Sequence, residues 1–126
     1  MDIVREELAA DPTIDITTTG RRSGEPRRIE IWMFDLDGRF FIAGTPGPRA
    51  WLANLIAHPA FTVHLKRNAH RDLPARATVV TDLGIRRRVA DERRRVGGEW
   101  VANQNDDDFV AHAPMVEVTF ESSASG

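Results

Sequence analysis

The chain reads TTTGRRSGEPRRIEIWMFDLDGRFFIAGTPGPRAWLANLIAHP from Thr17 to Pro59, and this stretch decides the fold. Residues 20–28 contain two glycines and a proline among charged side chains, with threonines before them and isoleucines after them. Glycine and proline favour turns, whereas β-branched residues favour extended backbone. The pattern therefore predicts two strands joined by a charged turn.

Four arginines are concentrated on this turn, namely Arg21, Arg22, Arg27 and Arg28. A guanidinium group offers forked donors that match phosphate and carboxylate oxygens, and glycine lets an anion approach backbone N–H groups. Like charges this close repel one another unless an anion neutralises them, which favours a phosphate-bearing ligand. The alternative is pairing with surface acids such as Glu25 and Glu30, and such pairs stabilise little.

A second loop of small residues reads AGTPGPR over 43–49 and leads from a predicted strand into a predicted helix. The free N–H groups and the positive dipole end of a helix N-terminus attract anions. The spacing of Gly44 and Gly47 matches neither the Walker phosphate loop nor the dinucleotide-binding fingerprint. A plain connection is therefore the alternative for this loop alone, but two such loops in one short chain favour a phosphate-bearing ligand.

The remaining chain shows clear periodicities over most of its length. They predict helices over 2–10, 49–57 and 82–96 and strands over 13–19, 28–34, 39–43, 61–66, 73–81 and 115–121. Asp35-Leu36-Asp37-Gly38 is typical of a hairpin turn, and residues 97–112 show no readable pattern. Consecutive strands joined by hairpins predict an α+β domain, 1–126, in which mostly antiparallel strands and short helices form a small barrel.

The composition limits the classes of function. With 126 residues and a net charge of −2, the chain lacks the basic excess of a nucleic-acid binder, so no nucleic acid is expected. The absence of cysteine excludes disulfides and thiolate chemistry. No secretion signal or membrane-spanning run is visible, so the default is a cytoplasmic protein. The arginines of 86–95 are interpreted as a solvated helix face rather than as a peripheral membrane contact.

The tryptophans and histidines give weaker indications. Trp32 and Trp100 are candidates for contact with a planar substrate, although each could instead cover a part of the core. Trp51 is expected in the core. The four histidines show no ligand spacing on a shared helix, so no metal site is predicted.

Three ordered blocks, TTTGRRSGEPRR, DGRFFIAGTPG and AWLANLIAHP, resemble the deazaflavin-dependent nitroreductase family of split β-barrel oxidoreductases. The resemblance covers residues 17–66 and implies a split β-barrel that binds reduced coenzyme F420. It implies that the coenzyme's phosphate and acidic tail are held on the arginine turn, by Arg21, Arg22, Ser23 and Arg27. The ring is then expected along Ala43, Gly44 and Thr45, and Asn54 should reach towards the ring or the phosphate from the helix. Gly24, Pro46, Gly47 and Arg49 complete the expected cofactor site.

The function that this resemblance implies is hydride transfer from the reduced deazaflavin to a small planar acceptor, such as a quinone, an enone or a nitro compound. Trp32 and Trp100 would then face the substrate, and Arg49 would supply a charge that the family often draws from a lysine. The alternatives are an FMN- or haem-binding split-barrel enzyme and a non-catalytic carrier of a cofactor or lipid. A monomer or a homodimer is expected.

Overall fold

The computed structural model describes residues 2–121 and contains six strands, four α-helices and one 3-10 turn in that range. In chain order these are α1 (Asp2–Ala10), β1 (Thr13–Thr19), β2 (Pro26–Leu36), β3 (Arg39–Ala43), α2 (Ala50–Ala57), β4 (Ala60–Leu65), β5 (Arg71–Val79), α3 (Leu83–Gly97), η1 (Gly98–Val101), α4 (Asp106–His112) and β6 (Met115–Phe120). None of the described helices is long and apolar enough to cross a membrane.

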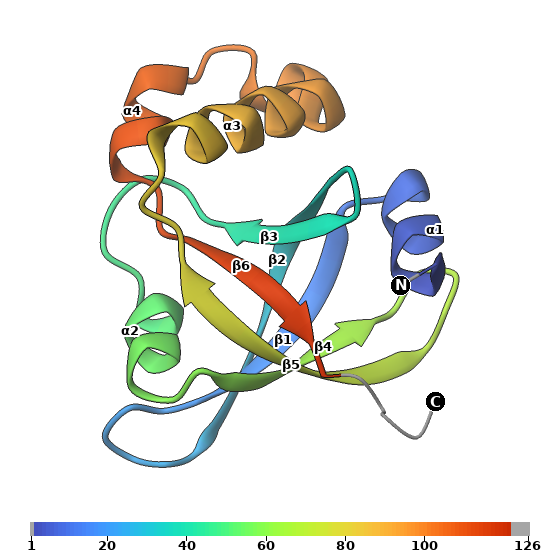
Figure 1. The fold of residues 1–126 in the computed structure, drawn as a ribbon, viewed down its shortest axis with the longest axis vertical. Coiled ribbons are helices and arrows are strands. Elements are labelled where there is room, and N and C mark those ends of the chain that lie inside the picture. The colour runs from blue at the N-terminus through green and yellow to red at the C-terminus, as the bar shows by residue number, and fades with distance from the viewer. Residues whose placement is uncertain (1, 122–126) are drawn as a thin grey trace.

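The six strands close into a barrel in the order β1-β2-β3-β6-β5-β4 (Figure 1). Each neighbouring pair is antiparallel, and β1 closes the barrel against β4 with Ile16 opposite Val63. The β2–β3 hairpin turns on Asp37 and Gly38, which both have positive φ (53° and 89°) as a type I′ turn requires. The predicted α+β split barrel is thereby confirmed.

Two apolar cores lie on the two faces of the barrel wall. Side chains alternate along β2, so Ile31 and Met33 point into the barrel while Phe34 and Leu36 point out. The outward side chains pack beneath α3 and α4, which cover this side of the barrel in Figure 1. A strand buried on both faces reads as a nearly continuous apolar run, which explains the sequence RFFIA of β3.

The segment without a readable pattern contains two short elements, η1 and α4. Asn105 caps α4, because its side chain accepts a hydrogen bond from the Asp108 N–H at 3.0 Å. Three aspartates follow in the first turn, where the helix dipole favours negative charge. Asn-Asp-Asp-Asp is thus a helix start that the sequence did contain, and the prediction missed it because Phe109 and Val110 are too few to show a period.

The prediction that the arginines of α3 form a solvated face is wrong for two of them. Arg86 is buried and donates to three backbone carbonyls, those of Val110 (2.5 Å), Val80 (3.0 Å) and Ala113 (2.6 Å). It therefore ties α3 to α4 and to the strand ends beneath them. Arg93 is also buried, one face of its guanidinium lying 4.4 Å from the ring centre of Phe109.

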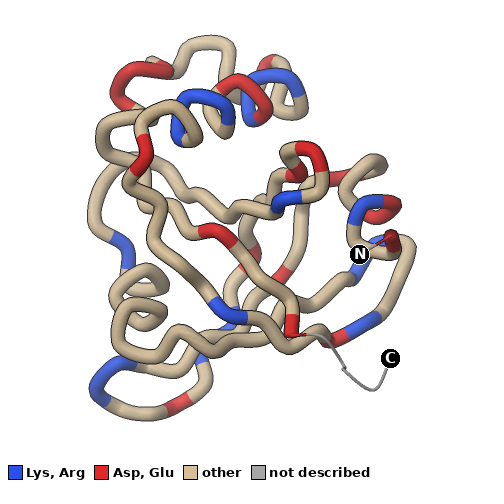
Figure 2. Tube along the Cα trace, viewed as in Figure 1, with Lys and Arg blue, Asp and Glu red and all other residues tan. Residues whose placement is uncertain are grey.

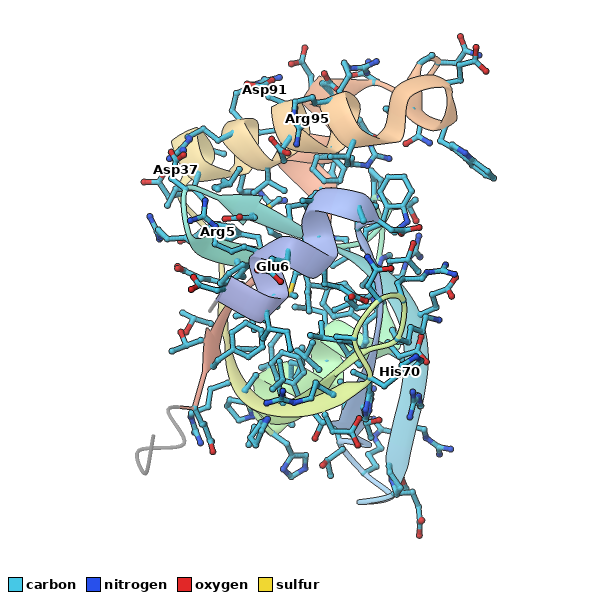
Figure 3. All side chains as sticks on the ribbon, turned by 90° about the vertical axis from the view of Figure 1, so that its right-hand side faces the viewer. Arg5, Glu6, Asp37, His70, Asp91 and Arg95 are labelled. Atoms are coloured by element: carbon cyan, nitrogen blue, oxygen red, sulfur yellow. The ribbon has the colours of Figure 1, made fainter. Side chains whose placement is uncertain are left out.

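The first helix is fixed to the barrel by a buried carboxylate. Glu7, 1% exposed, accepts hydrogen bonds from the backbone N–H groups of Arg67 (2.7 Å), Asn68 (3.0 Å) and Ala69 (2.9 Å) in the β4–β5 loop. Burial raises the pKa of Glu7, but the three N–H donors outweigh it and hold the pKa below its ordinary value. Figure 3 looks onto α1 and labels Arg5 and Glu6, the two exposed residues that precede Glu7 in this helix.

We expect Glu7→Gln to lower the free energy of unfolding by about 2–3 kcal/mol at pH 7, because an amide nitrogen would face N–H donors. A carboxyl whose pKa is depressed by folding contributes stability above its unfolded pKa, and this contribution is lost as the pH falls through the folded pKa. The difference between Glu7→Gln and the native chain should therefore shrink below about pH 4 in denaturant titrations. Glu6→Gln, the exposed neighbour, is the control and should change stability little at either pH.

Candidate functional site

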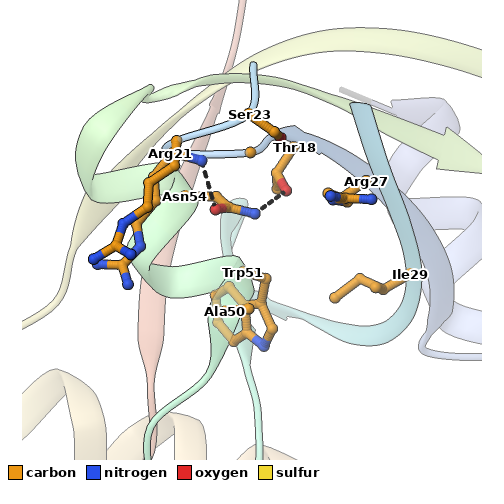
Figure 4. A pocket seen from close by; sticks show the side chains of 10 residues that line it. Thr18, Arg21, Ser23, Arg27, Ile29, Ala50, Trp51 and Asn54 are labelled. Carbon is orange, nitrogen blue, oxygen red and sulfur yellow. Dashed lines mark hydrogen bonds between the residues drawn. The ribbon is translucent and has the colours of Figure 1, made fainter. Parts of the chain in front are cut away.

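The arginine turn and the start of α2 enclose a pocket of about 360 Å³, which we call the arginine pocket. Its lining residues are Thr18, Gly20, Arg21, Arg22, Ser23, Arg27, Ile29, Ala50, Trp51 and Asn54. Figure 4 shows Trp51 and Asn54 entering from α2, with Arg27 and Ile29 on β2 across from them. The projecting β1–β2 turn also carries the basic tip seen at the lower left of Figure 2.

The guanidiniums of this pocket differ from most others in the structure in having no acidic partner. Within residues 2–121, Arg21, Arg22 and Arg27 form no ion pair. Arg28, the fourth arginine of the turn, pairs with Asp15 at 2.9 Å, and Glu30 pairs with Lys66 instead. Pairing with surface acids therefore accounts for Arg28 alone, and three cationic donors are left facing a cavity.

Hydrogen bonds between residues of the turn itself give it a defined shape. The N–H of Gly20 donates to the Glu25 carbonyl (2.8 Å), and the N–H of Gly24 donates to the Gly20 carbonyl (2.9 Å). Gly24 has φ 72°, and a Cβ on Gly20 would lie 2.5 Å from the Ser23 hydroxyl, so both positions favour glycine. Ser23 itself accepts from the Glu25 N–H at 3.1 Å.

Asn54 connects α2 to this turn. Its side-chain oxygen accepts from the Arg21 N–H (3.0 Å), and its amide nitrogen donates to the Thr18 hydroxyl (3.1 Å). With 7% of its surface exposed, Asn54 lines the arginine pocket while both of its polar ends bond the protein. The arrangement makes Asn54 a positioning residue that holds the arginine turn over the helix start.

A second cavity of about 230 Å³ lies between the outer face of the barrel and the α3–η1 segment, and we call it the tryptophan pocket. It is lined by Trp32, Phe34, Ala43, Gly44, Thr45, Arg93, Trp100, Val101 and Gln104. Trp32 packs edge-on against Phe34 with ring centres 6.4 Å apart, whereas Trp100 is 82% exposed at the rim. A mostly apolar wall with few polar groups suits a flat organic molecule.

The two pockets adjoin at a glycine. Gly44 lines the tryptophan pocket, and a Cβ added to it would lie 3.3 Å from Cζ2 of Trp51, which lines the arginine pocket. The indole of Trp51 and the ring of Pro114 fill the space that a side chain on Gly44 would occupy, so residues of the two pockets are packed against each other here.

Four of the predicted cofactor residues line neither pocket. Gly24 lies on the far side of the turn, and Gly47, with φ 117°, turns the chain towards α2. Arg49 bonds its own loop, because its guanidinium donates to the Thr45 hydroxyl and to the carbonyls of Pro48 (3.0 Å) and Pro46 (3.4 Å). Gly47 and Arg49 shape the loop before α2, and direct contact of Gly24, Pro46, Gly47 and Arg49 with a cofactor stays a prediction.

Phe34, Arg93, Val101 and Gln104 complete the tryptophan pocket, although the sequence reading assigned no site role to any of them. A signal for Arg93 was available. The buried residues Arg86, Val89, Ala90, Arg93 and Gly97 recur at helical spacing, so one face of α3 contains both arginines and small apolar residues. Within residues 2–121, no three histidine, aspartate or glutamate side chains gather as metal ligands would.

Solved structures similar to this one share its barrel at low sequence identity. A protein of the pyridoxinephosphate oxidase family from Clostridium acetobutylicum has a TM-score of 0.68 and 16% identity, with 95% of this chain and 82% of that chain covered. HutZ, the heme storage protein from Vibrio cholerae, gives 0.71 and 15%, covering 97% and 90%. An F420-H2 dependent reductase, FDR-A, gives 0.59 and 18%, covering 88% and 95%. At these identities the likeness concerns the fold, and no curated protein sequence matches the chain.

The barrel thus defines the chain as a split β-barrel protein. The model of the F420H(2)-dependent quinone reductase family matches residues 3–107, and the chain belongs to that family. This confirms the predicted resemblance and identifies coenzyme F420 as the cofactor. The residues present fit that group, since three unpaired guanidiniums suit an acidic tail and the adjoining apolar pocket suits a planar ring.

We expect Asn54→Ala to lower the free energy of unfolding by about 1–3 kcal/mol, because the Arg21 N–H and the Thr18 hydroxyl would lose their partner. Chemical denaturation measures this effect. Ile56→Ala, on the exposed face of the same helix, removes more apolar surface but should cost less. Equal losses in the two variants would contradict a positioning role for Asn54.

Proposed function

We propose that this chain transfers hydride from reduced F420 to a small planar acceptor, such as a quinone, an enone or a nitro compound. The observation that carries the proposal is the neighbouring pair of pockets, one with three unpaired arginines and one with an aromatic wall. With its anionic tail held in the first pocket, the same molecule would extend its planar end towards Gly44 and Trp51, where residues of the two pockets meet.

The chain's own residues bind, orient and shield the reactants. Arg21, Arg22 and Arg27 would hold phosphate and carboxylate oxygens by charge-assisted hydrogen bonds. Trp32 offers a face on which a flat acceptor can stack, and Trp100 at the rim would limit access of water. The deazaflavin, when bound, supplies the hydride, and the protein contributes proximity and alignment.

We expect Arg27→Gln to weaken F420 binding about 10- to 100-fold, the scale of one lost hydrogen bond to a charged group. Arg28→Gln is the matched control, because Arg28 lies on the same strand but pairs with Asp15 outside the pocket. Fluorescence titration with oxidised F420 measures both dissociation constants. Binding by the native chain should also weaken as salt rises, since the contact is between charges.

A parallel titration with FMN separates this proposal from its main alternative. Tighter binding of FMN than of F420 would mean that FMN is the cofactor of this barrel. Equal effects of Arg27→Gln and Arg28→Gln on F420 binding would show that the arginine pocket does not hold the coenzyme. Binding of F420 without turnover of menadione, a nitrofuran or cyclohexenone would favour a cofactor carrier over a reductase.

A further inference from the structure

Arg93 occupies an unusual position in the tryptophan pocket. It extends from the buried face of α3, only 6% of it is exposed, and it lines the cavity beside Trp32 and Trp100. The ring of Phe109 supports one face of its guanidinium, and its Nη2 donates to the side-chain oxygen of Gln104. Gln104 is held in turn, because its amide nitrogen donates to the Trp100 carbonyl at 3.1 Å.

The other terminal nitrogen of Arg93, Nη1, is buried and has no hydrogen-bond partner among the described residues. Buried donors are nearly always paired, and a charged donor left alone carries an uncompensated desolvation cost. Arg86 provides an internal comparison, since it lies two turns earlier on the same helix and is as deeply buried. Its guanidinium is paired with three carbonyls. Arg86 is buried because it anchors α3 to these carbonyls. The same explanation does not account for Arg93, whose Nη1 has no partner among the described residues.

The charge of Arg93 persists despite its burial. Burial lowers the pKa of its guanidinium and the Asp106 carboxylate raises it, while the ordinary value lies so high that the group stays protonated. A cation away from water acts more strongly on a neighbouring charge than it would in solvent. The wall of the tryptophan pocket therefore contains one fixed positive charge.

We propose that Arg93 is a catalytic residue whose guanidinium lies against the oxygen of the acceptor and stabilises the negative charge that develops there. This inference rests on the proposed function and deepens it. The acceptors that fit are planar molecules in which the carbon that receives the hydride is conjugated to an oxygen that takes up the negative charge, as in enones, quinones and aromatic nitro compounds.

The chemistry balances without any further reactant from the protein. The acceptor carbon gains a hydride with both electrons, forming a C–H bond as the coenzyme's C–H bond breaks and the coenzyme is oxidised. In an enone or a quinone, the π electrons move to the carbonyl oxygen, which becomes an enolate oxyanion beside Arg93; a reduced quinone then tautomerises to the hydroquinone. Water then supplies the proton, because a guanidinium remains charged at neutral pH. Preorganised donors at such an oxyanion contribute strongly to rate.

The test compares Arg93→Gln with the native chain using two acceptors and a binding measurement. Menadione forms an oxyanion when it accepts hydride, whereas the cationic phenazine methosulfate does not. We expect kcat for menadione to fall about 100-fold or more, the scale of a lost oxyanion donor. The dissociation constant of F420 and the rate with phenazine methosulfate should stay within about threefold. Arg93→Lys, which keeps a charge, should recover part of the menadione rate.

A second variant tests the same role in case Arg93→Gln does not fold. Gln104 is exposed, and Gln104→Glu would place a carboxylate on the guanidinium and reduce its pull on the acceptor. Its menadione rate should fall about tenfold with F420 binding intact. Native rates with menadione in both the Arg93 and Gln104 variants, or equal losses with both acceptors, would overturn the role of Arg93. A native chain that fails to bind F420 would overturn the proposed function together with this inference.

Discussion

The structure depends on the two-sided burial of β2. Along this strand, Ile31 and Met33 must fill the barrel while Phe34 and Leu36 support α3 and α4 on the other face. A shift of pairing by one residue would exchange the two sets, so the register is strongly specified. The Asp37–Gly38 turn pins one end of the strand, and pairing with β1 up to Thr19 opposite Pro26 fixes the other.

The same strand places the functional groups. Arg27 and Ile29 lie near its start and line the arginine pocket, whereas Trp32 and Phe34 lie further along and line the tryptophan pocket. The distance between a cation site and an aromatic site is thereby set by a paired strand and not by a loop. Sites on paired elements hold their geometry more precisely than sites on connections alone.

The sequence allowed the barrel and the arginine turn to be predicted, because local patterns determine both. Alternation in 28–34 and 61–66 predicted two of the barrel strands, and the Asp-Gly pair located the hairpin. The helical spacing of α3 puts Arg93 on the apolar face, but spacing alone does not show that a guanidinium there is buried. Its burial depends on Phe109 and Gln104, which follow it in a segment too short and polar to show a period. An arginine is normally expected at the surface, and here only contacts with residues of a later segment bury it.

Small residues decide how closely the helical cover approaches the barrel. A Cβ on Gly97 would lie 3.0 Å from Cγ1 of Val101 and 3.2 Å from Cζ3 of Trp32, so a larger residue would push the end of α3 away from the pocket. The cover thus forms one wall of the tryptophan pocket, while the arginine pocket is built from β1, β2 and α2 without it. Changes in α3, η1 and α4 can therefore alter the acceptor site while the arginine turn keeps its shape. Arg93 and Gln104 belong to this helical cover, whereas the arginines proposed to hold the cofactor lie on the β1–β2 turn and on β2. The charge at the acceptor site can therefore change without any change in the cofactor arginines.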